Sequence, residues 1–316
     1  MVTRVLHINN IASIGYGLCK TLNEYGIEAD LICRPSRSIG GKEEWIHTVK
    51  GRLNELKLNK IKINEYDIIH CHYLTNFLSL SISLRNIDKP IILHAHGTDT
   101  RPQNILRKIW QRYVASKGDT LIYSTPDLQE NLTWFKGEKI YLPNFSILKK
   151  ENLETEKYEN RVLIHARLTK NKQFEKLFLL IKDLKLNFDL FKIGPAIHYY
   201  MEYTPDNITF IEPVPHTKIP TLLEHYKLIL GRQDGSIGVS ELEAMSLGIP
   251  TLFPFNYNEF YEKPLPMPEM TSQNILGNFG NYKLGEKQKN WVDEYHNIRK
   301  VTKRLIEIYA RKLDEI

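Results

Sequence analysis

Short apolar runs alternate with amphipathic segments along this chain, and the alternation occurs twice. The runs of the first half lack a period-2 pattern, which is typical of strands buried on both faces of a sheet. Segments with helical spacing separate them at 16–25, 75–85 and 103–116. Repeated strand–helix–strand units imply a parallel sheet with right-handed crossovers. The predicted strands are 4–10, 29–33, 67–73, 90–97, 120–125 and 139–144.

A charged stretch at 149–160 has no periodicity and indicates a linker between two domains. The alternation then resumes, and from about 286 to 316 the apolar spacing predicts one long amphipathic helix. We therefore expect an α/β fold with Rossmann-like domains at 1–150 and 151–290. A C-terminal helix at 291–316 could pack back on the first domain. The second set of strands is expected at 161–167, 188–194, 208–214, 227–233 and 250–255, with helices at 172–184, 217–226 and 238–247.

Composition excludes several classes of protein. Hydrophobic residues make up 42% and charged residues 25% of the 316 residues, which excludes a disordered or fibrous chain. No apolar run approaches the roughly 20 residues that span a bilayer, and the first ten residues predict a strand instead of a signal peptide. The three cysteines lack metal-ligand spacing and indicate reduced core residues. These features predict a cytoplasmic protein.

The basic excess is confined to one half of the chain. Residues 1–150 hold 21 Lys and Arg against 14 Asp and Glu, whereas residues 151–316 hold 22 against 23. This asymmetry indicates an anionic partner for the first half, such as a membrane surface or a phosphorylated substrate. A solvated lysine-rich face is the alternative. No nucleic-acid-binding motif accompanies the excess, so we expect no nucleic-acid partner.

Polar residues end the predicted strands. Ligands of open parallel sheets bind beyond the carboxyl ends of the strands, so these residues are candidates for a site that takes a polyhydroxylated, phosphate-bearing molecule. The alternative is that strand ends are polar because they meet water. The residues are Asn9, Asn10, His72, His94, His96, Ser124 and Asn144 in the first half, and Arg167, Gly194, Glu212 and 232–234 in the second.

Two glycine-containing segments follow strands and open helices. Gly15 and Gly17 would let backbone amides approach an oxyanion at a helix N-terminus. The third glycine of the dinucleotide fingerprint is missing, and arginines stand where an acidic residue should close the next strand, so NAD binding is poorly supported. A turn without a ligand is the alternative. In the second segment, 231–250, Gly235 and Gly238 permit close backbone approach to a ligand.

Charged side chains near the second set of strand ends suit a nucleoside diphosphate. Arg167 ends a strand and Lys172 begins the next helix, which places two cations where a helix dipole also favours anions. Lys170 is better explained as part of a solvated loop. Glu243 is expected to face the ligand and could bind a ribose diol, with Leu242 and Met245 buried. Glu241 could be no more than a favourable charge at a helix N-terminus.

The chain resembles retaining GT-B glycosyltransferases, in particular glycosyltransferase family 4. The resemblance covers nearly the whole chain and implies two Rossmann-like domains facing each other across a cleft, with a long C-terminal helix. It rests on seven fragments in the family's order and on the closing run RLIEIY at 304–309. The fragments are DIIHCH at 67–72, HAHGTD at 94–99, YLPNFS at 141–146, ARLTKNK at 166–172, FDLFKIGP at 188–195, ITFIEPVP at 208–215 with Ile219 and Pro220, and ELEAMSLGIP at 241–250.

The resemblance implies site residues. Arg167 and Lys172 match the basic pair that binds the donor diphosphate, and Glu243 matches the glutamate that holds the nucleotide ribose. His96 matches the histidine that contacts the donor sugar. The expected catalytic residues are His96, Arg167, Lys172 and Asp234. The expected donor-binding residues are Gly15, Gly17, Gly194, Gly235, Ser236, Ile237, Gly238 and Glu243.

The sequence departs from the family at one position. The family's first glutamate should lie eight residues before Glu243, where this chain has Gly235. The neighbouring Asp234 could replace it if the loop carries a one-residue insertion, gripping a sugar hydroxyl or steadying positive charge at the anomeric carbon. Otherwise backbone amides of the loop 235–238 make that contact.

The resemblance implies transfer of a sugar from a nucleotide diphosphate donor to an acceptor hydroxyl, with retention of anomeric configuration and without a metal or other cofactor. The acceptor would be a glycan or a lipid-linked molecule. A predicted helix at 104–117 has the composition of a membrane-interface helix, with Arg107, Lys108, Trp110 and Arg112, and would place the protein on the cytoplasmic face of a membrane. Packing of its apolar side on the sheet is the alternative.

Two other functions share this fold. A nucleotide-sugar epimerase or hydrolase would also cleave the anomeric bond, although the segment 237–250 is less typical of it. A nucleotide-sugar-binding subunit with weakened catalysis would explain Gly235 at the glutamate position. The choice depends on site residues, because the fold supports all three functions.

Overall fold

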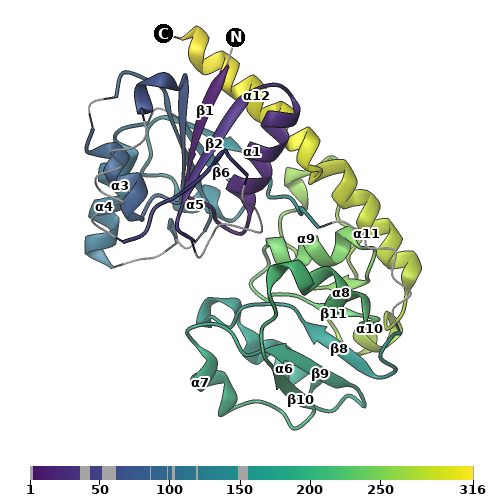
Figure 1. Ribbon diagram of the computed structural model, residues 1–316. Coiled ribbons are helices and arrows are strands. Elements are labelled where there is room, and N and C mark those ends of the chain that lie inside the picture. Colours follow the sequence, from purple (N-terminus) through teal and green to yellow (C-terminus); the bar gives the residue numbers. More distant parts are fainter. Residues whose placement is uncertain are drawn as a thin grey trace. The chain divides into compact units, whose positions relative to one another are not determined.

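The computed structural model describes residues 3–35, 43–51, 62–85, 87–97, 99–101, 104–118, 120–148 and 156–315 (Figure 1). The chain divides into two compact units. Unit 1 comprises residues 1–145 and 298–316, and unit 2 comprises residues 146–297. Each unit is built on an open parallel sheet, so the expected α/β fold is confirmed. Most of the predicted linker lies outside the described residues.

The sheet of unit 1 has the order β3-β2-β1-β4-β5-β6-β7, and all neighbouring strands run parallel. The order reverses between β1 and β4, which is the switch point where such sheets bind ligands. The strands are β1 (Arg4–Ile8), β2 (Glu28–Cys33), β3 (Ile46–Thr48), β4 (Ile68–His72), β5 (Ile91–Ala95), β6 (Thr120–Tyr123) and β7 (Glu138–Tyr141).

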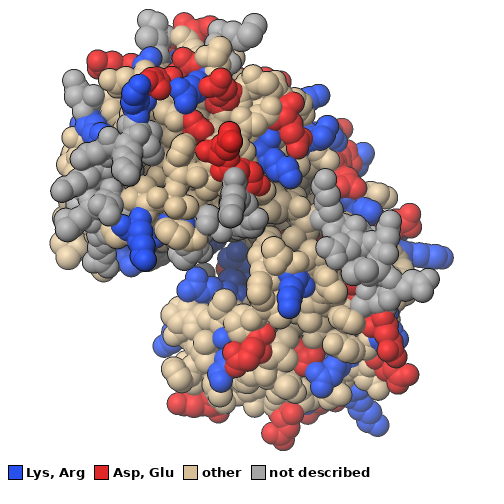
Figure 2. Space-filling model, viewed as in Figure 1, with Lys and Arg blue, Asp and Glu red and all other residues tan. Residues whose placement is uncertain are grey.

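Helices lie on both sides of this sheet. Figure 1 shows α1 and α12 on one side and α3 and α4 on the other, and α12 packs directly on α1. The solvent-facing side of α12 carries charges of both signs, and Figure 2 shows basic and acidic side chains interspersed over this part of unit 1. The helices are α1 (Ile14–Glu24), α3 (Phe77–Ser83), α4 (Ile105–Ala115), α5 (Leu128–Asn131) and α12 (Ile298–Asp314), with a 3₁₀ turn η2 (Ile63–Glu65).

Unit 2 has a five-stranded parallel sheet in the order β10-β9-β8-β11-β12, with its switch point between β8 and β11. The strands are β8 (Arg161–Ile164), β9 (Asn187–Phe191), β10 (Ile208–Ile211), β11 (Ile229–Leu230) and β12 (Thr251–Leu252). The helices are α6 (Phe174–Ile181), α7 (Ile197–Met201), α8 (Ile219–Glu224), α9 (Val239–Ser246), α10 (Ser272–Gly277) and α11 (Tyr282–Tyr295), with 3₁₀ turns η3 (Lys170–Lys172), η4 (His216–Lys218) and η5 (Asn258–Phe260).

Successive residues of β8 enter different cores, because side chains alternate between the two faces of a strand. Val162 and Ile164 belong to a cluster that includes Phe174 of α6. Leu163 packs on the opposite face in a cluster with Leu223 of α8. The sheet is thus covered on both sides, which is why its strands are continuous apolar runs.

The structure differs from the sequence prediction at several elements. The predicted long C-terminal helix is present as α12, but it begins only at Ile298 and a separate helix, α11, precedes it, because the chain leaves the helical conformation at His296, whose buried ring bonds to the hydroxyl of Tyr261. The short elements β3, α5, α7 and α10 were not predicted. Cys19, Cys33 and Cys71 are buried in unit 1, as expected of core residues. Among the described residues, no helix has both the length and the apolar character needed to cross a membrane.

The packing of α11 generates a test of the fold of unit 2. A Cβ atom on Gly285 would lie 2.1 Å from the backbone oxygen of Gly248, so Gly285→Ala requires a backbone shift. We expect a loss of about 1–3 kcal/mol in the free energy of unfolding, as for other overpacked sites. Gly277→Ala in α10 is the control, because nothing lies within 4 Å of its added Cβ. Urea unfolding measures the stability of the two variants. Equal stabilities would contradict the close contact between Gly285 and Gly248.

Candidate active site

Three loops meet at the carboxyl edge of the sheet in unit 2. The amide of Leu168 donates to the carbonyl of Ile193 at 2.8 Å, which joins the loop after β8 to the loop after β9. The amide of Gln233 donates to the carbonyl of Lys172 at 3.1 Å, which joins the loop after β11 to η3. Because β8 and β11 flank the switch point, these bonds gather the predicted donor-binding segments where the topology favours a ligand.

Gly194 allows the loops after β8 and β9 to pack closely. Its φ is +128°, and a Cβ there would lie 2.1 Å from the carbonyl oxygen of Leu168. No other residue fits this position without moving the segment that carries Arg167. The Arg167 side chain is exposed at this edge, and Lys172 is partly buried.

Glu241 holds the loop after β11 in place. Its two carboxylate oxygens accept hydrogen bonds from the amides of Arg232, at 2.9 Å, and Gly238, at 3.0 Å. The side chain is buried, and with Gly238 it closes the N-terminus of α9. Glu241 is therefore a structural residue that fixes both ends of the loop.

The loop also explains what stands at the family's glutamate position. Gly235 has a φ of +79°, and a Cβ there would lie 2.3 Å from the side-chain nitrogen of Asn256. The neighbouring Asp234 forms a two-point ion pair with Arg232, and both side chains are nearly buried. Ser236 and Ile237 are also buried. A glutamate at position 235 would have to adopt a left-handed backbone conformation and displace the Asn256 side chain.

Glu243 lies beside two histidines that the sequence analysis did not single out. Its carboxylate accepts hydrogen bonds from Nε2 of His216 at 2.6 Å and from Nε2 of His165 at 3.2 Å. Burial alone would raise the pKa of Glu243, but the two histidines outweigh it and hold that pKa below its usual value. The hydrogen bond to Glu243 in turn raises the pKa of His216. Leu242 and Met245 are buried, as predicted.

The signal for these histidines was present but weak. His165 lies two residues before Arg167, and His216 follows the segment 208–215 that carries the family resemblance. Both reach Glu243 only through the fold, since 78 and 27 residues separate them from it.

In unit 1 the predicted residues follow β1 and β5. Gly15 and Gly17 lie in the first turn of α1, and a Cβ on Gly15 would lie 2.7 Å from the carbonyl oxygen of Asn9. The amide of Gly17 already donates to the carbonyl of Ser13, and the amide of Tyr16 donates to the side chain of Asn10. Gly15 is therefore a close-packing position at the start of a helix.

His96 follows β5 directly, and its amide donates to the carboxylate of the fully buried Asp99 at 3.1 Å. The same carboxylate accepts from the amide of Leu74, which joins the loops after β4 and β5. Burial raises the pKa of Asp99 to about 6. Nε2 of His96 lies 2.9 Å from Nδ1 of His72, so the predicted sugar-contacting ring belongs to a hydrogen-bonded cluster of histidines.

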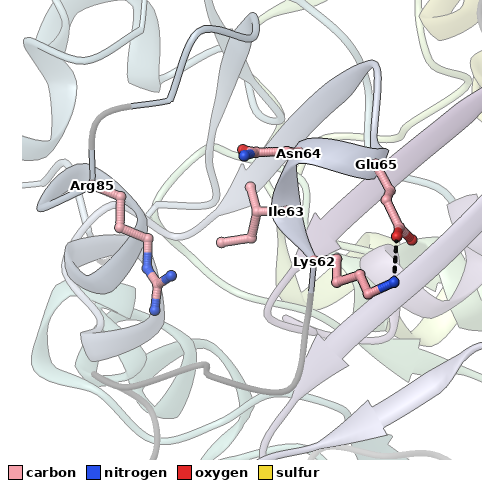
Figure 3. Close-up of a pocket in the computed structure, with 5 residues that line it drawn as sticks. All are labelled: Lys62, Ile63, Asn64, Glu65 and Arg85. Carbon is pink, nitrogen blue, oxygen red and sulfur yellow. Dashed lines mark ion pairs between the residues drawn. The ribbon is translucent and has the colours of Figure 1, made fainter.

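A separate pocket of about 410 Å³ opens in unit 1 and is shown in Figure 3. Lys62, Ile63, Asn64, Glu65 and Arg85 line it. Because η2 precedes β4, this pocket lies toward the amino ends of the strands. The predicted site residues of unit 1 follow the carboxyl ends, so the pocket is not part of the candidate site.

Comparison with known proteins agrees with this architecture. The family model of Glycosyltransferase Family 4 matches residues 13–142. AviGT4, a glycosyltransferase involved in avilamycin A biosynthesis, superimposes with a TM-score of 0.68 at 12% identity, over 100% of this chain and 99% of its own. The DNA-modifying enzyme β-glucosyltransferase gives 0.59 at 12% identity, over 99% and 98%. The chain has the GT-B fold.

The resemblance to GT-B glycosyltransferases of family 4 is thus confirmed, with the family match confined to residues 13–142. The UDP-N-acetylglucosamine 2-epimerase of Rickettsia bellii also superimposes, with a TM-score of 0.55 at 17% identity, over 100% of this chain and 98% of the epimerase. No curated protein matches the sequence. The GT-B fold alone therefore does not separate sugar transfer from epimerisation.

The contact between His216 and Glu243 predicts that the pKa of His216 depends on the negative charge of Glu243. In Glu243→Gln the negative charge disappears while the shape remains, so the pKa of His216 should fall to or below that of an ordinary histidine. The raised pKa of His216 stabilises the folded state below about pH 6.5, and this contribution disappears as pH rises through the folded-state pKa. The lowered pKa of Glu243 has the opposite effect: it stabilises the folded state at higher pH, and this contribution is lost as pH falls through the folded-state pKa of Glu243.

NMR titration of the His216 ring in wild type and Glu243→Gln measures this effect. Glu294→Gln is the control, because Glu294 pairs with Lys263 on the surface of the same unit. An unchanged His216 pKa in Glu243→Gln would show that the two side chains are not coupled in solution.

Proposed function

We propose that this chain is a retaining glycosyltransferase that transfers a sugar from a nucleotide diphosphate donor to an acceptor hydroxyl. The observation that carries the proposal is the gathering of Arg167, Lys172 and the loop 231–238 at the switch point of the sheet in unit 2. Two cations beside a helix N-terminus suit a diphosphate, whose leaving oxygen they would stabilise. The family match over residues 13–142 supports the same chemistry.

The reaction would proceed as follows. The bond between the anomeric carbon and the diphosphate oxygen breaks, and the diphosphate keeps the electron pair. The acceptor oxygen forms its bond to the anomeric carbon on the same face, and its proton passes to the departing diphosphate. Arg167 and Lys172 would balance the charge without a metal ion, and His96 would orient the sugar.

Glu243 would bind the ribose, and its surroundings support that role. A carboxylate oxygen has two lone pairs, and each oxygen of Glu243 uses one of them for a histidine. His165 and His216 would keep the carboxylate charged and oriented. The ion pair of Asp234 with Arg232 favours the loop amides over Asp234 as the contact to the donor sugar, with Asp234 holding Arg232.

Neighbouring lysines provide a matched test of diphosphate binding. We would measure the shift in melting temperature of wild type with UDP, UDP-glucose and UDP-N-acetylglucosamine, each with and without EDTA. A ligand at a hundred times its Kd stabilises the folded state by about 2.7 kcal/mol. Lys172→Met should abolish the shift. Lys170→Met should retain it, because Lys170 is exposed and its ammonium lies over the Tyr199 ring.

The outcomes separate the candidate functions. Equal loss in both lysine variants, or loss of the shift with EDTA, would contradict the metal-free diphosphate site. An epimerase function, which the neighbour from Rickettsia bellii suggests, is favoured if UDP-N-acetylglucosamine changes configuration at the sugar ring without an added acceptor, as followed by proton NMR. Binding without any product would favour a nucleotide-sugar-binding subunit.

We further propose that α4 contacts an anionic membrane surface carrying a lipid-linked acceptor. Ile105, Leu106 and Ile109 are 73%, 74% and 62% exposed, whereas the side that packs inward presents Gln111, Val114 and Ala115. The exposed residues Arg107, Lys108 and Arg112 accompany this apolar surface, and Trp110 is partly buried. An apolar strip flanked by cations is the pattern of an interfacial helix.

Pelleting with vesicles of phosphatidylglycerol and phosphatidylcholine tests the membrane proposal. We expect binding at low salt that weakens with salt and falls at least tenfold in Ile105→Ser combined with Ile109→Ser. Leu179→Ser is the control, because Leu179 is similarly exposed on α6 of unit 2. Wild-type protein that stays in the supernatant at low salt would overturn the proposal.

A further inference from the structure

Five histidines share one face of the sheet in unit 1. His7 lies on β1, His70 and His72 on β4, and His94 on β5, with His96 directly after it. Residues two apart on a strand point to the same face, and the registers pair His7 with His70 and His72 with His94. The first four rings are buried. Tyr309 of α12, also buried, brings a hydroxyl into the same cluster.

The rings are joined end to end by hydrogen bonds. On one side of the Tyr309 hydroxyl, Nε2 of His7 lies 3.3 Å away and Nδ1 of His7 lies 2.9 Å from Nε2 of His72. Nδ1 of His72 then lies 2.9 Å from Nε2 of His96, and Nδ1 of His96 lies 3.4 Å from the hydroxyl of Ser124. On the other side, Nδ1 of His70 lies 2.5 Å from the Tyr309 hydroxyl, and Nε2 of His70 lies 3.1 Å from Nδ1 of His94.

Ser124 sets the direction of these bonds. Its hydroxyl has one proton and donates it to the carbonyl of Ala95 at 3.0 Å, so toward His96 it can only accept. The proton of a neutral His96 must then be on Nδ1, and Nε2 of His96 accepts from Nδ1 of His72. The same reasoning applied ring by ring gives His72 and His7 a proton on Nδ1, with Nε2 of His7 accepting from Tyr309.

The direction continues beyond the tyrosine. Because the Tyr309 hydroxyl gives its proton to His7, it accepts from Nδ1 of His70, whose Nε2 accepts from Nδ1 of His94. Nε2 of His94 is then an unprotonated nitrogen, and this buried atom has no partner among the residues that the structure describes. The reverse direction would leave a buried N–H there and would take the Ser124 proton from Ala95. An unpaired donor is the rarer arrangement in proteins.

Burial keeps the first four rings neutral. It lowers the pKa of His7 to about 3 and holds the pKa values of His70, His72 and His94 well below that of an ordinary histidine. A doubly protonated ring would also break the chain, because it could accept no hydrogen bond.

We propose that Tyr309, Ser124 and the five histidines form a one-way hydrogen-bond relay in which every imidazole carries its proton on Nδ1. Tyr309 and Ser124 are positioning residues, since they act on His96 through this relay. The relay ties α12 to the edge of the sheet that follows β5, and it fixes His96 as an acceptor at Nε2 and a donor at Nδ1. That His96 thereby orients a donor sugar rests on the proposed function, whereas the tautomers do not.

A metal ion is the competing explanation, because His72, His94 and His96 offer nitrogens within 4.8 Å of one another. A three-histidine metal site needs ring lone pairs that converge on one point. Here Nδ1 of His72 and Nε2 of His96 lie 2.9 Å apart and bond to each other, and the rings of His94 and His96 stack with an interplanar angle of 28°. Lone pairs lie in the ring planes, so these rings favour bonds to one another over convergence on an ion.

The test is long-range proton–nitrogen NMR of the ligand-free full chain, labelled with ¹⁵N-histidine, at pH 7.5. We expect His7, His70, His72, His94 and His96 to show a protonated Nδ1 and an unprotonated Nε2. Imidazole in water prefers the opposite tautomer, so the exposed His198 serves as the internal reference. A protonated Nε2 in any of the five rings of wild type would overturn the relay.

Two substitutions test its connectivity. In Tyr309→Phe, Nδ1–H of His70 loses its acceptor, and reversing the bond to His94 would leave Nε2–H of His94 unpaired instead, so His70 and His94 should average between tautomers while His72 and His96 remain as they are. Ser124→Ala removes the group that sets the direction, and the five rings should then average between tautomers. Tyr261→Phe is the matched control, because it removes a hydroxyl from His296 outside the relay.

The NMR measurement needs neither a sugar donor nor activity. The relay can therefore be wrong while the proposed function is right, and the proposed function can be wrong while the relay is right. If neither substitution alters the nitrogen shifts of the predicted rings, the relay is wrong. Zinc retained at one ion per chain, or shifts of the His72, His94 and His96 nitrogens upon addition of EDTA, would replace it with a metal site.

Discussion

All described strands of each sheet run parallel, and the positions of the chemically useful residues depend on this constraint. Parallel strands need a crossover for every return, so helices occupy both faces and water reaches the sheet at its edges. Polar groups can then gather only where strands end. In unit 2 the carboxyl edge collects Arg167, Lys172 and the loop before α9, and the close approach at Gly194 keeps these segments together.

The same constraint makes the histidines of unit 1 unusual. A sheet covered by helices is normally lined with aliphatic side chains, and an unsatisfied buried polar group costs about 1–3 kcal/mol. The imidazoles avoid most of this cost because each ring offers one donor and one acceptor in opposite directions. A row of such rings can satisfy itself, provided that something ends it at both sides. The Tyr309 hydroxyl, from the last helix of the chain, bonds to both His7 and His70. It thereby joins two rows of rings, each of which would otherwise end there in an unpaired buried nitrogen.

The sequence predicted what depends on local pattern and missed what depends on distant contacts. Strands such as β1 and β8 were found because runs buried on both faces are apolar throughout. The edge strand β3 has only three residues, all partly or fully exposed, so it has no such pattern. Glu243 was predicted as a site residue, but its partner His165 lies 78 residues away, and no spacing rule connects two residues at that separation.

Gly235 shows how a departure from a family pattern can be interpreted only in three dimensions. Read from sequence, a glycine in place of a glutamate indicates a lost carboxylate. In the structure the glycine has a positive φ, its carbonyl accepts from the amide of Asn256 at 3.0 Å, and the Asn256 side chain fills the space of a Cβ. Replacing Gly235 alone by glutamate would therefore not restore a family site, because the loop is shaped around the glycine.

The neighbouring ion pair changes what this loop can offer a ligand. Arg232 and Asp234 neutralise each other, and Glu241 fixes the backbone on which both stand. Both side chains are nearly buried, so the carboxylate of Asp234 is already paired and differs from the free glutamate that the family resemblance implies. Under the proposed function, a donor sugar would therefore meet the backbone amides of the loop and not a carboxylate at this position.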